Sequence, residues 1–252
     1  MDTRKSFDWE SFEAVLYDLD GVLTATARVH AAAWKRMFDE FLAAHAERTG
    51  TPFVPFDKEA DYRPYVDGKP RYDGVATFLA SRGIELPRGA PTDSPDQLTV
   101  CGLGNRKNEL IQEVLAAEGV EVFEGSVKLV RHLKRLGLRQ AVVSSSKNAE
   151  PVLRAGGILD LFDARVDGEV AAREKLPGKP RPDTFLEATR LLGVPASRAV
   201  VVEDAIAGVE AGVAGGFGLV IGVDRVGDPE ALRVAGAHVV VGDLGELLPP
   251  PS

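Results

Sequence analysis

The sequence has almost no cysteine and no long apolar run. Cys101 is the single cysteine among 252 residues, so no disulfide can form within the chain, and a reducing compartment is favoured. No apolar stretch approaches the roughly 20 residues needed to span a bilayer. Residues 1–13 mix charged and aromatic side chains and have no apolar centre of the kind found in secretory signals. We therefore expect a cytoplasmic protein without a membrane partner.

An excess of positive charge is also missing. Lys and Arg number 30 against 38 Asp and Glu, which gives a formal net charge of −8. A surface of that sign repels the phosphate backbone of nucleic acids and anionic lipid head groups. Nucleic acid is therefore a poor candidate partner. Separately, we expect the protein to be a monomer. A chain of this length can bury roughly 70–75% of its unfolded surface, so it needs neither a disulfide nor a structural metal.

Short apolar runs alternate with helical patterns over most of the chain. The runs of strand length are residues 14–17, 140–143, 199–202, 218–221 and 238–241. Runs rich in β-branched residues are typical of a parallel sheet that is covered on both faces. Helical patterns over 126–136 and 183–192 each end at a glycine, which commonly stops a helix. The alternation predicts an α/β fold with a doubly wound parallel sheet.

Residues 27–119 interrupt this alternation. Helical patterns cover 29–46, 74–81 and 106–118, whereas 51–70 is rich in Pro, Asp and Tyr and is typical of a loop. No strong strand pattern lies between these segments. We therefore predict two domains. The core is formed by residues 1–26 and 120–252, and a helical domain, 27–119, is inserted after the first strand.

Acidic residues follow the first predicted strand. Asp18 and Asp20 stand two apart, and the period of a strand points both carboxylates the same way. Gly21 lets the backbone turn sharply beside a ligand. Ligands of open α/β sheets bind beyond the carboxyl ends of the strands. An isolated pair of this kind commonly does no more than cap a turn, so a functional site requires further polar residues at the same edge.

Three later segments supply such residues. The turn 144–148, after the second core strand, is rich in hydroxyl groups and suits a phosphate at a helix N-terminus. Lys179 stands in a proline-rich turn that fixes the backbone around it. Glu203 and Asp204 are adjacent acids after the strand 199–202. Each segment alone has an ordinary structural explanation, but their common position favours a single active site.

These four segments resemble the four motifs of the haloacid dehalogenase superfamily, in the same order and over essentially the whole chain. Residues 18–24 are similar to the first motif, Ser144 to the second, Lys179 to the third, and Glu203 with Asp204 to the fourth. The inserted helical domain resembles the cap of that family. The resemblance implies phosphoryl transfer in which Asp18 is the nucleophile and forms an aspartyl-phosphate.

The same resemblance implies roles for the other motif residues. Asp20 would act as general acid and then as general base. Ser144 and Lys179 would stabilise charge on the oxygens of the transferred phosphoryl group. The implied cofactor is Mg²⁺, held by oxygen ligands among Asp18, the backbone carbonyl of Asp20, Glu203 and Asp204. Dehalogenation itself is disfavoured, because that chemistry needs neither a metal nor a second aspartate.

Within the superfamily the chain resembles the β-phosphoglucomutase branch, whose substrate is a small phosphorylated sugar. That branch interconverts β-glucose 1-phosphate and glucose 6-phosphate through a bisphosphate. The likeness implies these substrate-binding residues: Thr26, His30, Trp34, Gly68, Arg71, Lys107, Ser146, Lys147 and Asn148. Arg71 has a fork of donors suited to the second phosphate. His30 would pair with a cap group such as Lys107, and a closing cap would exclude water.

Other functions stay open on the sequence alone. A phosphatase of the same family, acting on a sugar phosphate, needs the core motifs but not the full set of His30, Arg71 and Lys107. A phosphonate hydrolase needs a cap lysine that forms a Schiff base, and none is evident. An inactive phosphosugar-binding module is disfavoured, because pure binding has no use for a nucleophile with a paired acid. Trp34 and the insert cations also have ordinary readings, as core and as surface charge.

Overall fold

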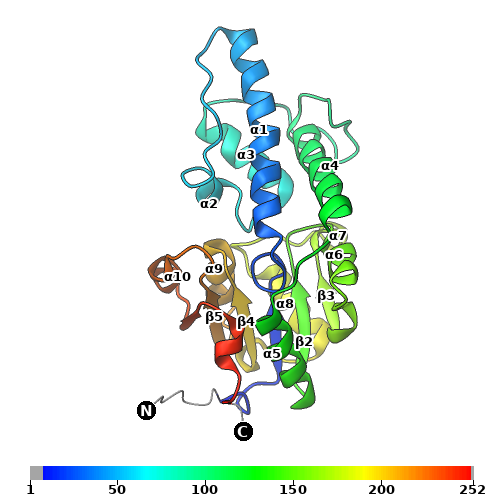
Figure 1. Ribbon diagram of the computed structural model, residues 1–252, viewed down its shortest axis with the longest axis vertical. Coiled ribbons are helices and arrows are strands. Elements are labelled where there is room, and N and C mark those ends of the chain that lie inside the picture. Colours follow the sequence, from blue (N-terminus) through cyan, green and yellow to red (C-terminus); the bar gives the residue numbers. More distant parts are fainter. Residues whose placement is uncertain (1–7, 251–252) are drawn as a thin grey trace. The chain divides into compact units, whose positions relative to one another are not determined.

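The structure is a computed structural model that describes residues 8–250 (Figure 1). Residues 1–7, which begin the segment expected to lack a secretory signal, lie outside the described residues, as do 251–252. The chain divides into two compact units, which are Met1–Ala25 with Val120–Ser252, and Thr26–Gly119. We call them the core unit and the insert unit. The boundary expected from the sequence lies one residue further along, after residue 26.

Six parallel strands within residues 8–250 form one sheet in the core unit, in the order β3-β2-β1-β4-β5-β6. Their bounds are β1 Ala14–Tyr17, β2 Arg139–Val143, β3 Ala164–Val166, β4 Ala199–Glu203, β5 Leu219–Val223 and β6 Val239–Val241. All four residues of β1 are buried, as expected for a strand between two neighbours under helices on both faces. The predicted doubly wound fold is confirmed, and β3 is the strand that the sequence pattern missed.

Helices connect the strands and cover both faces of the sheet. Their bounds are α5 Glu124–Arg135, α6 Ala149–Ala155, α7 Gly168–Glu174, α8 Asp183–Leu192, α9 Ile206–Ala214 and α10 Pro229–Val234. Crossovers between parallel strands are right-handed, so α5 and α6 lie on one face and α8, α9 and α10 on the other. On the second face, Phe185 of α8 and Val209 of α9 share a buried cluster with Leu16 of β1 and Val201 of β4. This packing fixes the strands whose ends carry the motif residues.

The insert unit is helical, with no strand among its described residues. Its helices are α1 Ala27–Thr49, α2 Tyr62–Tyr65, α3 Arg71–Ser81 and α4 Val100–Glu118. Phe38 of α1 packs against the rings of Trp34, Phe56 and Phe78, with centroids 4.1 to 5.3 Å apart. The insert unit therefore has an aromatic core of its own. Neither unit, within residues 8–250, contains a helix that is long and apolar enough to cross a membrane.

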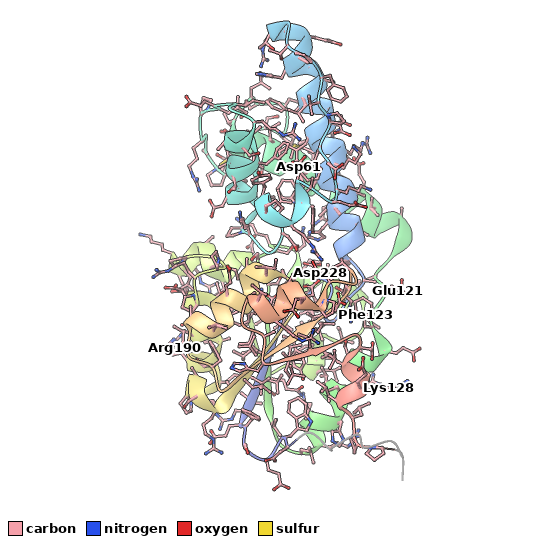
Figure 2. The ribbon with its side chains drawn as sticks, turned by 90° about the vertical axis from the view of Figure 1, so that its left-hand side faces the viewer. Asp61, Glu121, Phe123, Lys128, Arg190 and Asp228 are labelled. Carbon is pink, nitrogen blue, oxygen red and sulfur yellow. The ribbon has the colours of Figure 1, made fainter. Side chains whose placement is uncertain are left out.

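The segment 51–70 is more ordered than its composition indicates. It contains the single turn α2, so the expectation of a loop throughout was wrong at these four residues. Asp61, labelled in Figure 2, is buried just before α2 and accepts from Arg82 at 2.6 Å. Its other bond is to the backbone amide of Asp57, at 2.9 Å. These polar contacts fix a segment whose sequence has no helical period.

Candidate active site

The edge of the sheet beyond β1 and β4 brings together motif residues that are far apart in the sequence. The ammonium of Lys179 donates to a carboxylate oxygen of Asp18 at 2.5 Å and also to Glu203. It makes a third bond to the carbonyl oxygen of Val143, at the end of β2, at 3.1 Å. Lys179 is 3% exposed and Glu203 is fully buried. Topology explains the meeting, because β1 lies between β2 and β4 and all three strands end at the same edge.

Burial and charge act against each other on the pKa values of this group. Burial alone would lower the pKa of Lys179, but the carboxylates of Asp18 and Glu203 raise it above its ordinary value. Burial raises the pKa of Glu203 to about 7, against the attraction of Lys179. The ammonium therefore stays charged and holds the Asp18 carboxylate in a fixed place.

Glu203 has protein partners for both of its oxygens. One accepts from Lys179, and the other accepts from the backbone amides of Asp204 and Ala205, both at 3.1 Å. Gly208 in α9 makes room for this carboxylate, because a Cβ at that position would lie 1.9 Å from it. Glu203 thus fixes the turn from β4 into α9 and, with it, the position of Asp204.

Three carboxylates of the core unit could hold a cation. Oxygen atoms of Asp18, Glu203 and Asp204 all lie within 4.8 Å of one another. Lys179 brings one positive charge against these three groups, so a divalent cation would relieve an excess of negative charge. Hard carboxylate oxygens are the ligands that Mg²⁺ prefers. Asp20 is not part of this carboxylate group as found in the described residues, and the resemblance assigned a ligand role to its backbone carbonyl instead.

Gly21 lets the turn after Asp18 approach Asp204 closely. Its φ is +89°, and a Cβ there would fall 1.8 Å from a carboxylate oxygen of Asp204. The turn is closed by a bond from the Gly21 amide to the carbonyl oxygen of Thr24, at 2.8 Å. The hydroxyl of Thr24, which is fully buried, donates to the carbonyl oxygen of Leu19 at 3.2 Å. Asp20 lies within this tight turn, between Asp18, which is held by Lys179, and Thr24, which is held by its own hydrogen bonds.

Ser144 stands directly after β2, the strand that pairs with β1. Its hydroxyl accepts from the amide of Ser146, and the hydroxyl of Ser146 accepts from the amide of Asn148, each at 3.1 Å. The carbonyl of Ser146 also accepts from the amide of Gly168, at 3.0 Å. Such side-chain turns order the hydroxyl-rich loop before α6. Ser144 and Asn148 are buried, whereas Ser146 and Lys147 are half-buried.

A second group of predicted residues meets inside the insert unit. The ammonium of Lys107, on α4, lies 3.1 Å from Nδ1 of His30, on α1. It also lies 4.7 Å from the ring centroid of Trp34, a cation–π contact. Burial first, and then the charge of Lys107, lower the pKa of His30 well below its ordinary value. Thr26, just before α1, is 2% exposed and its carbonyl accepts from the His30 amide.

Arg71 belongs to another contact group of the insert unit. Its guanidinium donates to the hydroxyl of Tyr72 at 3.3 Å and to the side-chain oxygen of Asn105 at 3.4 Å. The Tyr72 hydroxyl donates to the same oxygen at 2.9 Å. Gly68, with φ of +68°, is three residues before Arg71. Sequence reasoning missed Tyr72 and Asn105. Tyr72 directly follows Arg71, and Asn105 directly precedes the helical pattern predicted over 106–118.

The fold and this arrangement of acids around a buried lysine define the class of protein. Residues 12–216 match the model of a family described as haloacid dehalogenase-like hydrolase, and the chain belongs to that family. The protein is therefore an enzyme, a phosphomutase or a phosphatase.

Its relatives narrow the class to the β-phosphoglucomutase-like members. The chain is 52% identical to the β-phosphoglucomutase of Mycobacterium bovis over 242 residues. This alignment covers 95% of this chain and 92% of that protein. The crystal structure of β-phosphoglucomutase from Clostridium difficile matches with a TM-score of 0.73 and 25% identity, over 94% and 93% of the two chains. CbbY from Rhodobacter sphaeroides, in complex with phosphate, matches with a TM-score of 0.69 and 27% identity, over 94% and 96%.

Proposed function

We propose that the protein is a β-phosphoglucomutase that converts β-glucose 1-phosphate into glucose 6-phosphate. One observation carries the proposal. In a chain that is 52% identical to a mycobacterial β-phosphoglucomutase, the buried ammonium of Lys179 holds the carboxylate of Asp18 at the strand edge where ligands bind. A nucleophile held in this way is of use to phosphoryl transfer and not to mere binding. A small phosphorylated sugar is the proposed substrate.

Two transfers in opposite directions account for the conversion. In the first, the phosphoryl group of aspartyl-phosphate at Asp18 passes to the 6-hydroxyl of the sugar, and Asp20 takes the hydroxyl proton. The product is a bisphosphate, which turns around in the site. In the second, a carboxylate oxygen of Asp18 attacks the phosphorus of the 1-phosphate, and Asp20 returns the proton to the departing sugar oxygen. Glucose 6-phosphate leaves, and the aspartyl-phosphate is restored.

Lys179 and Ser144 are proposed to stabilise charge on the phosphoryl oxygens during both transfers. We propose Mg²⁺ as the cofactor, held by Asp18, Asp204 and the backbone carbonyl of Asp20, with Glu203 beside it. The carboxylate group around Gly21 supports this assignment. When bound, the metal would screen the repulsion between the Asp18 carboxylate and the phosphoryl oxygens.

The insert unit is proposed to act as a cap that binds the substrate and excludes water. Arg71 is the proposed ligand of the distal phosphate, because its planar fork can donate two parallel bonds. The other proposed substrate-binding residues are Thr26, His30, Trp34, Gly68, Lys107, Ser146, Lys147 and Asn148. Exclusion of water separates a mutase from a phosphatase, because water would hydrolyse the aspartyl-phosphate.

The test is an assay of two products in one tube. Purified protein receives Mg²⁺, β-glucose 1-phosphate and a trace of glucose 1,6-bisphosphate, and both glucose 6-phosphate and free phosphate are followed. We expect glucose 6-phosphate with little free phosphate. Free phosphate released in step with substrate loss would establish the family phosphatase instead. The absence of both products would overturn the proposed substrate.

A further inference from the structure

Arg225 lies outside the four motif segments, in the loop after β5, yet it reaches the turn that carries Asp20. Its Nε donates to the carbonyl oxygen of Gly21 at 2.7 Å, across 204 positions of the sequence. Its Nη1 donates to the carbonyl oxygen of Gly242, after β6, at 2.9 Å. The side chain is 19% exposed. One guanidinium therefore ties the turn after Asp18 to the far end of the sheet.

The flat face of the same guanidinium covers an aromatic ring. The Arg225 Cζ lies 3.7 Å from the ring centroid of Phe123, which is labelled in Figure 2. Arginine stacks on aromatic faces in this way without giving up its in-plane hydrogen bonds. The amide of Phe123 donates to the carbonyl oxygen of Leu23 at 3.0 Å, and the amide of Ala25 donates to that of Glu121 at 2.9 Å. Arg225 thus packs on the place where the two connections of the core unit to the insert are hydrogen-bonded together.

An ordinary ion pair does not explain this placement. Within residues 8–250, Arg225 forms an ion pair with Asp243, whose carboxylate oxygen lies 3.9 Å from Nη1, a long distance for a salt bridge. Burial lowers the pKa of the Arg225 guanidinium, and the charges of Asp243 and Asp204 oppose that effect. Within residues 8–250, Nη2 is buried and has no hydrogen-bond partner. The side chain is therefore largely buried, and its close contacts are two backbone carbonyl oxygens and an aromatic ring.

We propose that Arg225 is a positioning residue for phosphoryl transfer. It fixes the carbonyl of Gly21 and so sets the turn from Asp18 to Thr24 against the carboxylate of Asp204. The turn has little room to shift, because a Cβ on Gly21 would already lie 1.8 Å from a carboxylate oxygen of Asp204. A lysine would keep the charge but could not bond both carbonyls in one plane and cover the ring. This inference rests on the proposed roles of Asp18 and Asp20.

The test compares Arg225→Met and Arg225→Lys with the control Arg233→Met. Arg233 lies on α10, is half exposed and pairs with Glu230 on the same helix. For Arg225→Met we expect kcat to fall by about tenfold to a hundredfold, the cost of a small misplacement of reacting groups, with KM within about threefold. Arg225→Lys should lose less kcat than Arg225→Met, and Arg233→Met should have the kcat and KM of the parent enzyme.

Amide hydrogen exchange, followed without substrate, separates positioning from general damage. In Arg225→Met we expect exchange of the amides of residues 20–24 to speed up by about tenfold or more, while the amides of β1 and β4 keep their protection. Unchanged exchange at 20–24, a kcat within twofold of the parent, or faster exchange throughout the core unit would each overturn the proposal. A parent enzyme without mutase activity would remove the proposed function alone, because the exchange result does not depend on turnover.

Discussion

The ammonium of Lys107 lies 3.1 Å from Nδ1 of His30 within the insert unit. An ammonium can only donate a hydrogen bond, so Nδ1 has to accept it. This hydrogen bond therefore requires a neutral His30 ring with its proton on Nε2. Lys107 is 5% exposed and its charge also rests on the face of Trp34. The pair is thus built around one buried positive charge, and a second charge on the imidazole would repel it.

We predict that His30 stays neutral far below the usual titration range of histidine. Burial and the charge of Lys107 lower its pKa, whereas in the unfolded chain the ring takes up a proton near pH 6.5. The resulting contribution to stability is complete above that pH and is lost as the pH falls toward the lower pKa of the folded state. The ¹⁵N shifts of the ring nitrogens report the titration. A Lys107→Met variant should move the midpoint upward, and a native midpoint at or above 6.5 would contradict the prediction.

The two aspartates of the first motif should fail in different ways. Asp18→Asn removes the nucleophile, and we expect kcat to fall by at least about 10³-fold. Asp20→Asn leaves the nucleophile in place but removes acid–base catalysis, which costs about 10² to 10⁴-fold. Labelled glucose 1,6-bisphosphate should still transfer its phosphoryl group slowly to the Asp20→Asn protein and not to Asp18→Asn. Asp160 is exposed, and the control Asp160→Asn should keep the activity of the parent enzyme. Labelling of the Asp18→Asn protein would exclude Asp18 as the phosphoryl acceptor.

Gly21→Ala tests the close approach of the turn to Asp204. Gly137→Ala is a matched control, because φ is +84° there and nothing lies within 4 Å of the new Cβ. Both variants should lose about 1–3 kcal/mol of stability through backbone strain. Only at Gly21 would the new methyl group push the Asp204 carboxylate away. We expect Gly21→Ala alone to weaken Mg²⁺ binding by about tenfold or more, as measured by calorimetry. Equal Mg²⁺ affinity in the two variants would contradict this.

Local patterns predicted the elements in which one period and its end signals agree. The helix predicted over 183–192 has the same bounds in the structure. Gly193 marks its C-terminal end in the sequence, and in the structure this glycine adopts the left-handed conformation that stops a helix. β3 was missed because Arg165 stands in the middle of its three residues. That arginine pairs with Glu150 and Asp167 at 2.7 Å each, contacts that no short-range pattern encodes.

The same limit applies to the site. Asp18 and Lys179 were recognisable because each stands at the end of an apolar strand or in a motif with a definite order. Arg225 and Asn105 were not, since both act on partners that leave little trace in the sequence. Arg225 bonds two glycine carbonyls, and Asn105 donates to backbone carbonyls as well. Residues that hold backbone in place become visible only when the fold brings the distant segments together.

Mg²⁺ should stabilise the folded protein through the acidic group of the core unit. A ligand that binds only the folded state at about 100 times its Kd adds about 2.7 kcal/mol. We therefore expect Tm to rise with added MgCl₂ and to return to its starting value with excess EDTA. Asp204→Asn should abolish most of the rise, whereas Asp160→Asn should keep it. A Tm that responds equally in both variants would place the bound ion elsewhere.

The insert unit should depend on Phe38 for its own stability. The side chain is fully buried, and its ring centroid lies 4.1 Å from that of Phe78. Phe38→Ala should cost about 3–5 kcal/mol, because it removes a large ring and leaves a cavity. Phe53→Ala, in the same unit but 49% exposed, should change stability by no more than about 0.5 kcal/mol. Hydrogen exchange can assign the loss, because α1 and α4 should lose protection in Phe38→Ala while β1 and β4 keep theirs. Loss of protection in both units together would mean that the core unit cannot stay folded without the insert, and equal effects of the two substitutions would mean that the aromatic core does not hold the insert unit together.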